Sequence, residues 1–157
     1  MGTMLQPNSL FQVAEIQLTY RTGFNLSDAP VIRQSADAFD ILSACWNPDT
    51  IGLFEEFKVL LLNRANKVLG VVCVSSGGMT GTIVDVRLVF GAALKGAATS
   101  LILSHNHPSG NLKPSVADLT LTRKLVEAGK VLDLPVLDHI ILTPEGAYKS
   151  FADEGLI

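Results

Sequence analysis

The segment SLILSHNHPSGNLKPSVAD, residues 100–118, is an apolar run that ends in two histidines and leads into a predicted helix start. Residues 100–103 predict a short buried strand, and Ser115 marks the start of a helix that reaches about residue 130. In extended backbone, alternate side chains project to the same side, so His105 and His107 are predicted to face together. We therefore expect the chemistry of this chain at a junction between a strand and a helix.

Apolar strands and helices alternate on both sides of this junction. A helix capped by Ser35 is predicted to run to about residue 46, and two strands of a hairpin follow at residues 55–62 and 68–75. The remaining predictions are a short strand near residues 80–83, a helix capped by Asp85 that runs to about residue 98, and a strand at residues 136–142. This alternation predicts an α/β fold, a single-domain sandwich of a mixed β-sheet flanked by helices.

The start of the chain is predicted to be a lead-in to the main domain. Alternating apolar residues predict one strand at residues 11–20, and residues 23–30 read as a polar connector. We therefore divide the chain into a lead-in, residues 1–30, and one domain, residues 31–157. A chain of 157 residues can bury roughly 70% of its unfolded surface, so its core needs no disulfide or structural metal.

Composition excludes several classes of protein. The chain is 48% hydrophobic, which is too apolar for a disordered protein. Its most apolar stretch, residues 88–103, is broken by Lys95 and is too short for a membrane span, so we interpret it as buried core. No export signal is recognisable at the N-terminus, and the cytoplasm is the expected compartment. A formal net charge of −3 without a concentrated basic face disfavours direct DNA binding.

The two cysteines have apolar neighbours and lie far apart in the sequence. Cys45 and Cys73 are therefore interpreted as buried, reduced residues rather than as a disulfide or a metal-binding pair.

The junction offers a metal ion two imidazoles and one carboxylate. Seven residues separate His107 from Ser115, and two more separate Ser115 from Asp118, which falls in the first turn of the predicted helix. Three protein ligands suit a catalytic zinc with a position left for water, whereas structural zinc normally takes four. The alternatives are a capping box formed by Ser115 and Asp118, and a solvated loop that carries the histidines. The combination predicts one zinc ion per chain, bound by His105, His107 and Asp118.

Hydrolysis at a catalytic zinc also needs a base that accepts the proton of the attacking water. Two glutamates begin the first hairpin strand, and alternation places Glu55 on the face of Phe57 but Glu56 on the face of Lys58. A carboxylate on an apolar face is costly unless something holds it, so Glu55 is the predicted base. The alternative is that Glu55 simply reaches solvent at the start of the strand.

A third histidine follows an aspartate in the last predicted strand. His139 is interpreted as a core or edge histidine rather than as a fourth ligand, because a third imidazole would fill the position that water needs. Asp138 is a candidate for orienting one of the ligand histidines through a hydrogen bond.

The spacing of these groups resembles the signature of a known superfamily. Glu55 on a strand, His105-x-His107, Ser115 and Asp118 together resemble the motif of the JAMM (MPN, or JAB-domain) zinc metalloproteases. The segment SHNHPSG, residues 104–110, with LDH at residues 137–139, is similar to the bacterial RadC-like branch. The similarity covers roughly residues 31–157.

This resemblance implies a cytidine-deaminase-like α/β fold and zinc bound by His105, His107 and Asp118. It also implies Glu55 as general acid and base, and Ser115 as a hydroxyl that steadies the oxyanion. Longer RadC-like proteins carry an N-terminal helix-hairpin-helix segment, and we expect this chain to be a compact form without it.

The expected function is that of a zinc-dependent hydrolase, a metallopeptidase or isopeptidase that cleaves an amide bond of a peptide or protein. The alternative is a non-catalytic, DNA-repair-associated interaction module that retains the metal site.

Overall fold

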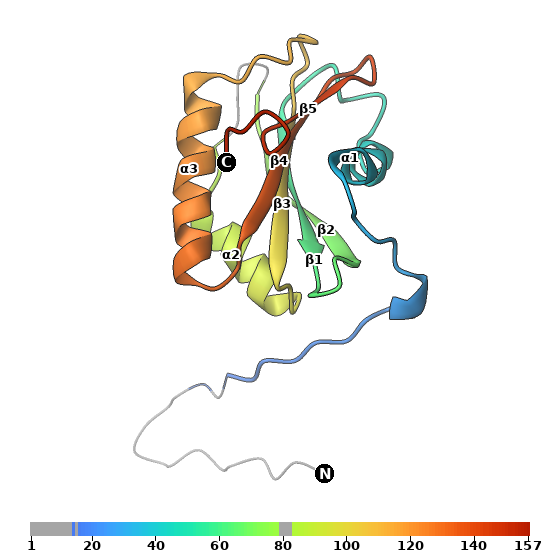
Figure 1. The fold of residues 1–157 in the computed structure, drawn as a ribbon, viewed down its shortest axis with the longest axis vertical. Coiled ribbons are helices and arrows are strands. Elements are labelled where there is room, and N and C mark those ends of the chain that lie inside the picture. Colours follow the sequence, from blue (N-terminus) through green and yellow to red (C-terminus); the bar gives the residue numbers. More distant parts are fainter. Residues whose placement is uncertain (1–13, 15, 79–82) are drawn as a thin grey trace.

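A five-stranded sheet forms the centre of the molecule, in the order β2-β1-β3-β4-β5 (Figure 1). The computed structural model describes residues 14, 16–78 and 83–157. Its strands are β1 (Glu56–Leu62), β2 (Val68–Ser76), β3 (Ser100–Asn106), β4 (Val136–Leu142) and β5 (Tyr148–Ser150). Neighbouring strands are antiparallel except β3 and β4, which are parallel, so the sheet is mixed as predicted.

Helices cover both faces of this sheet (Figure 1). The helix α1 (Ser35–Ala44) packs on one face, and α2 (Val86–Lys95) and α3 (Val116–Val131) pack on the other. A short 3-10 helix, η1 (Leu26–Asp28), precedes α1. The predicted α/β sandwich of a mixed sheet flanked by helices is confirmed.

Alternate residues of β1 point into two separate cores. Val59 packs with Phe90 of α2 and Leu125 of α3, whereas Leu60 packs with Leu42 of α1. Because helices cover both faces, Lys58 is also buried, and its Nζ donates a hydrogen bond of 2.9 Å to the carbonyl of Cys45. Neither face of β1 is thus a solvent face.

Several predicted elements differ from the structure. Ala14 and residues 16–20 of the predicted first strand are exposed and belong to no strand, and residues 11–13 and 15 lie outside the described residues. The strand predicted near residues 80–83 also lies outside them, apart from Ile83, which is not in a strand. The helix α1 has Gln34 rather than Ser35 at its N-cap, and the short strand β5 was not predicted.

The apolar stretch at residues 88–103 is only partly core. The helix α2 buries Val89, Phe90 and Ala93, but Leu88 and Leu94 are exposed on its other side. The interpretation of this whole stretch as buried is therefore wrong. Within the described residues, no helix has the combination of length and apolar character needed to cross a membrane.

The cysteines are free thiols as predicted, but their predicted burial is wrong. Cys45 and Cys73 are both exposed. Cys45 follows the last residue of α1, and Cys73 lies on β2, at the edge of the sheet. Apolar neighbours in the sequence did not reveal these peripheral positions.

Candidate metal centre

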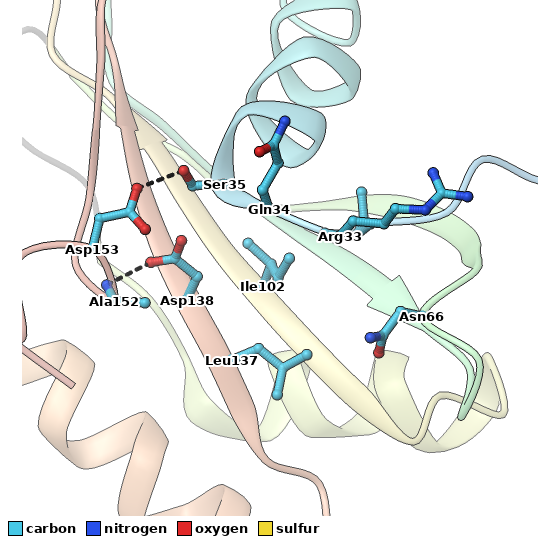
Figure 2. Close-up of a pocket in the computed structure, with 10 residues that line it drawn as sticks. Arg33, Gln34, Ser35, Asn66, Ile102, Leu137, Asp138, Ala152 and Asp153 are labelled. Atoms are coloured by element: carbon cyan, nitrogen blue, oxygen red, sulfur yellow. Dashed lines mark hydrogen bonds between the residues drawn. The ribbon is translucent and has the colours of Figure 1, made fainter.

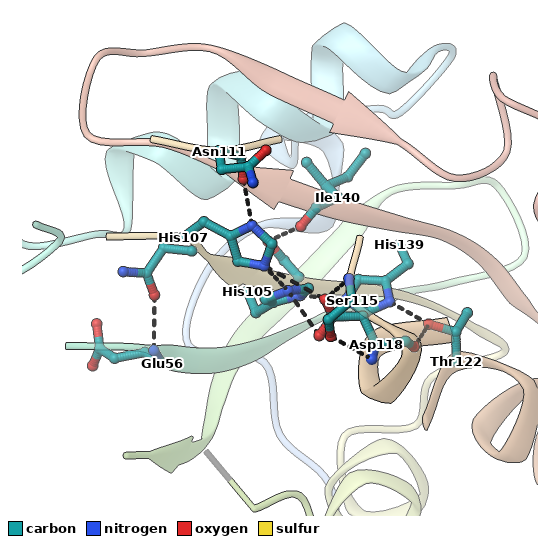
Figure 3. Close-up of polar contacts among 11 residues, drawn as sticks. Glu56, His105, His107, Asn111, Ser115, Asp118, Thr122, His139 and Ile140 are labelled. Carbon is teal, nitrogen blue, oxygen red and sulfur yellow. Dashed lines mark hydrogen bonds and ion pairs between the residues drawn. The ribbon is translucent and has the colours of Figure 1, made fainter. Parts of the chain in front are cut away.

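Three candidate ligands converge where β3 ends and α3 begins (Figure 3). The Nε2 atom of His105 lies 2.9 Å from Nε2 of His107 and 3.3 Å from Oδ1 of Asp118. The Nε2 atom of His107 lies 3.5 Å from Oδ2 of Asp118. Ligand atoms of the three residues all lie within 4.8 Å of one another. Two imidazoles and a carboxylate are a donor set that suits a divalent transition metal, so this cluster could bind a metal ion.

The path of the chain explains why these groups meet. The amide of His107 donates a hydrogen bond of 2.8 Å to the carbonyl of Leu142, which extends the pairing of β3 with β4. Gly110 has a φ of 77°, a left-handed conformation that favours glycine, and its amide donates to the carbonyl of His107. This turn directs the chain towards the start of α3. The cluster thus lies beyond the carboxyl ends of two parallel strands, where α/β proteins commonly bind ligands.

A capping box orients the carboxylate of Asp118. The hydroxyl of Ser115 accepts a hydrogen bond of 3.1 Å from the amide of Asp118, and Oδ2 of Asp118 accepts one of 2.7 Å from the amide of Ser115. The capping box and the candidate ligand position therefore coexist. Capping uses a lone pair of the Ser115 oxygen and leaves the hydroxyl proton free to donate elsewhere. The proposed oxyanion role of Ser115 does not compete with its role as a cap.

The electrostatics of the cluster favour positive charge at its centre. Burial raises the pKa of Asp118, but hydrogen bonds from His105 and His107 outweigh this and hold the pKa well below 3.8. The hydrogen bond to Asp118 raises the pKa of His107 above 6.5 despite desolvation, and the Asn111 carbonyl and the charge of Glu55 add to this. In the metal-free protein a proton on His107 therefore pairs with Asp118, and a metal ion would displace it.

Glu55 lies just before β1, beside His107. Phe57 pairs with His105 in the antiparallel ladder, and continuing that register brings Glu55 opposite His107. The charge of Glu55 raises the pKa of His107, which agrees with this placement. Glu56 instead forms an ion pair of 3.4 Å with Lys58. The position of Glu55 suits the predicted base, and its catalytic role stays a prediction.

Asn106 fastens the segment that carries Glu55. Its Nδ2 donates to the carbonyls of Ile51 and Phe54 at 2.7 and 2.9 Å, and its Oδ1 accepts from the amide of Glu56 at 2.8 Å. The side chain is fully buried. Sequence analysis missed this residue, although its place between the two histidines put it on the opposite face of the strand.

His139 is buried beside the cluster, behind His105 (Figure 3). Its Nε2 lies 2.7 Å from Nδ1 of His105, and its Nδ1 lies 2.7 Å from Oγ1 of Thr122. Complete burial lowers the pKa of His139 well below 6.5, and the neighbouring His105 lowers it further. This agrees with the interpretation of His139 as a core histidine rather than a fourth ligand. Thr122 was missed, although it lies one helical turn after Asp118 and hence on the same side of α3.

Asp138 lies on the opposite face of the sheet, at a cavity of about 250 Å³ beside α1 (Figure 2). Its carboxylate accepts hydrogen bonds from the hydroxyl of Ser150 and from the amides of Ala152 and His139. Burial raises the pKa of Asp138, although these hydrogen bonds oppose the rise. The expectation that Asp138 orients a ligand histidine is wrong, since His139 makes that contact.

Comparison with known proteins gives a consistent result. The sequence profile of the family described as RadC-like JAB domain matches residues 32–156. A UPF0758 protein of Flavobacterium johnsoniae is 52% identical over 127 residues, which cover 80% of this chain and 53% of that relative. UPF0758 proteins of Symbiobacterium thermophilum and Porphyromonas gingivalis are 47% and 45% identical over 103 residues, which cover 66% of this chain and 44% and 45% of theirs. The chain thus spans about half the length of these curated relatives, and their names state no activity.

Proposed function

Because this chain belongs to the RadC-like JAB domain family, we propose that it is a zinc-dependent hydrolase, a metallopeptidase or isopeptidase that cleaves an amide bond. The observation that carries the proposal is the convergence of His105, His107 and Asp118 on one point. Three protein ligands are the set found at catalytic zinc sites, which keep a position open. Zinc supplies Lewis acidity there, which polarises a substrate carbonyl and makes water a nucleophile near neutral pH.

Glu55 is the proposed proton carrier. Its carboxylate takes a proton from the attacking water and later delivers a proton to the nitrogen of the departing amine, which leaves Glu55 ionised again. Its place opposite His107, outside the cluster of three ligand groups, suits a base beside the metal rather than a fourth ligand. Asn106 holds the backbone of this segment by hydrogen bonds to Phe54 and Glu56, which keeps Glu55 in reach of the substrate.

Ser115 is the proposed donor to the oxygen that becomes negatively charged as the amide is attacked. The hydroxyl is exposed at the N-terminus of α3, next to Asp118, and its proton is not used by the cap. Hydrogen-bond donors aimed at such an oxygen are worth on the order of 3 kcal/mol of transition-state stabilisation. The start of a helix, with its partial positive charge, adds to this effect.

The proposed partner is a peptide or protein rather than DNA, in keeping with the net charge of −3. The test is to incubate the zinc-loaded protein with a library of peptides that includes side-chain isopeptides, and to identify new amino groups by mass spectrometry. We expect Glu55→Gln to retain zinc but to cleave at least about 100-fold more slowly than the wild type. Glu56→Gln is the matched control, because Glu56 pairs with Lys58, and it should keep its activity.

Two results would count against the proposal. Undiminished cleavage by Glu55→Gln would remove Glu55 from the mechanism. A wild-type protein that binds zinc but cleaves no member of the library would favour a non-catalytic interaction module instead.

A further inference from the structure

We propose that Thr122 and His139 are positioning residues that fix the tautomer of His105, so that Nε2 of His105 presents a lone pair to the metal ion. This inference rests on the metal site of the proposed function, but it does not depend on hydrolysis. Thr122, His139 and His105 are all buried, with exposed fractions of 1%, 0% and 1%, so each of their polar atoms depends on a protein partner.

The direction of each hydrogen bond follows from the first one. Oγ1 of Thr122 donates to the main-chain carbonyl of Asp118 at 2.6 Å, because a carbonyl oxygen can only accept. A hydroxyl carries a single hydrogen, so the contact of 2.7 Å between Thr122 and Nδ1 of His139 requires the ring nitrogen to donate. His139 therefore carries its proton on Nδ1.

The same reasoning applies to His105, whose ring contacts that of His139. A neutral imidazole carries one N–H, so Nε2 of His139 has a lone pair and accepts at 2.7 Å from Nδ1 of His105. The ring of His139 is completely buried, with Phe57 and Phe151 at ring-centre distances of 5.5 and 4.6 Å, and burial away from water disfavours a charged imidazole. When neutral, the His105 ring consequently keeps its proton on Nδ1 and has a lone pair on Nε2, the atom that faces Asp118.

His107 reaches the same tautomer in a different way. Its Nδ1 lies 2.5 Å from the main-chain carbonyl of Asn111, which can only accept, so Nδ1 carries a proton, and Nε2 has the lone pair once the ring is neutral, as metal binding requires. A loop carbonyl is enough for His107, which lies nearer the surface, with 15% of its side chain exposed. His105 is enclosed in the core, and the Thr122–His139 pair supplies the acceptor there. Partners of this kind raise metal affinity by orienting the ligand ring and fixing its tautomer.

Thr122→Val is the direct test, because it replaces the hydroxyl by a methyl group of similar size. Without its acceptor, Nδ1–H of His139 is left unsatisfied, and the ring gains by moving the proton to Nε2. That proton would then be donated to Nδ1 of His105, which pushes the proton of His105 onto Nε2 and blocks the ligand atom. Thr122→Ser keeps the hydroxyl and should restore wild-type behaviour. Thr120→Val, at an exposed threonine of the same helix, controls for the added methyl group.

Two measurements report the result without any substrate. Long-range proton–nitrogen NMR spectra of the metal-free protein, at a pH above the histidine titrations, should show His105 and His139 of the wild type protonated on Nδ1. In Thr122→Val both rings should shift towards the Nε2-protonated form. Chelator competition should show zinc affinity about tenfold lower in Thr122→Val than in Thr122→Ser and Thr120→Val.

The wild-type spectrum alone can overturn the inference, even if Thr122→Val does not fold. A wild type that binds zinc but carries the His105 proton on Nε2 contradicts the proposed tautomer and leaves the proposed function standing. Equal zinc affinity and equal spectra in Thr122→Val and Thr122→Ser would also contradict it. A wild type that binds no zinc would overturn both proposals together.

Discussion

Neighbouring residues of β3 and β4 serve different purposes on the two faces of the sheet. His105 and His139 point towards α3, where they contact each other at the candidate metal centre. Asn106 and Asp138 point towards the α1 face and hold loop backbone by hydrogen bonds. On the α1 face every one of these groups has its partner without a metal ion. On the α3 face, lone pairs and a carboxylate converge and are completed only by a cation or a proton.

This difference between the two faces means that residues that stabilise the fold can be distinguished by mutation from residues that would bind a metal ion. Substitutions on the α1 face should cost folding free energy whether or not a metal is bound. Substitutions among the candidate ligands should cost metal affinity, and much less folding free energy in the metal-free protein.

Asn106→Ala should give the largest loss of stability. It strips partners from the partly buried carbonyls of Ile51 and Phe54 and from the amide of Glu56, so we expect about 3 kcal/mol of destabilisation. Urea unfolding of the metal-free protein measures this. Asn111→Ala is the control, since the Asn111 side chain is exposed, and it should change stability by less than about 0.5 kcal/mol. Equal costs for the two variants would break the contrast between the faces.

His107→Gln should have the opposite effect, a large loss of metal affinity with little loss of stability in the metal-free protein. Loss of one of the three candidate ligands should lower zinc affinity on the order of 100-fold, measured by chelator competition. Because the His107 side chain keeps some exposure, 15%, and glutamine is also polar, the metal-free protein should lose only about 1 kcal/mol. A variant that binds zinc as tightly as the wild type would show that His107 is not a ligand.

The two aspartates should respond to pH in opposite directions. The pKa of Asp118 is lowered on folding, so its stabilisation is present above 3.8 and is lost as pH falls through its folded pKa. The pKa of Asp138 is raised, so its stabilisation is present below 3.8 and is lost as pH rises through its folded pKa. From acid to neutral pH, the advantage of the wild type over Asp118→Asn should therefore grow, and its advantage over Asp138→Asn should shrink.

The pKa of His107 sets the upper pH limit of the stabilisation that involves Asp118. It is raised on folding, so its stabilisation is present below 6.5 and is lost as pH rises through the folded pKa. The ion pair with Asp118 should thus stabilise the metal-free protein most between pH 3.8 and 6.5. Denaturant unfolding of metal-free samples across this range checks both trends, and parallel curves for the two asparagine variants would contradict them.

The smallest expected effect is a shift in the pKa of His107, which distinguishes the two adjacent glutamates. Glu55→Gln should lower the pKa of His107, because it removes a negative charge that favours the protonated imidazole. Glu56→Gln should leave it nearly unchanged, since Glu56 pairs with Lys58. An NMR titration of His107 in the metal-free protein measures both. A larger shift in Glu56→Gln would mean that the wrong glutamate has been assigned to the centre.

The ligand set was predictable because short-range geometry determines much of it. Strand alternation placed His105 and His107 together, and helix-start signals placed Asp118 in the first turn of α3. The contacts of Thr122, His139 and Asn106 were not predicted, because they cross between elements far apart in the sequence.

Errors in the predicted fold have a similar cause. Alternation in β1 placed Glu56 with Lys58, but it could not show that Lys58 is buried against the ring of Trp46, which follows α1, with Nζ 4.3 Å from the ring centre. The apolar surroundings of Cys73 in the sequence suggested burial, but β2 lies at the edge of the sheet. Local pattern predicts the type of an element well, whereas its exposure depends on which elements become its neighbours.

X-ray absorption spectroscopy at the zinc edge tests the central claim most directly. After dialysis against zinc, we expect one retained zinc per chain, bound by two imidazole nitrogens at about 2.0–2.1 Å together with oxygen donors. Loss of the imidazole signal in a variant that replaces both His105 and His107 would assign it to this centre. Failure of the wild type to retain zinc, or sulfur scattering at about 2.3 Å in place of imidazole, would contradict the claim.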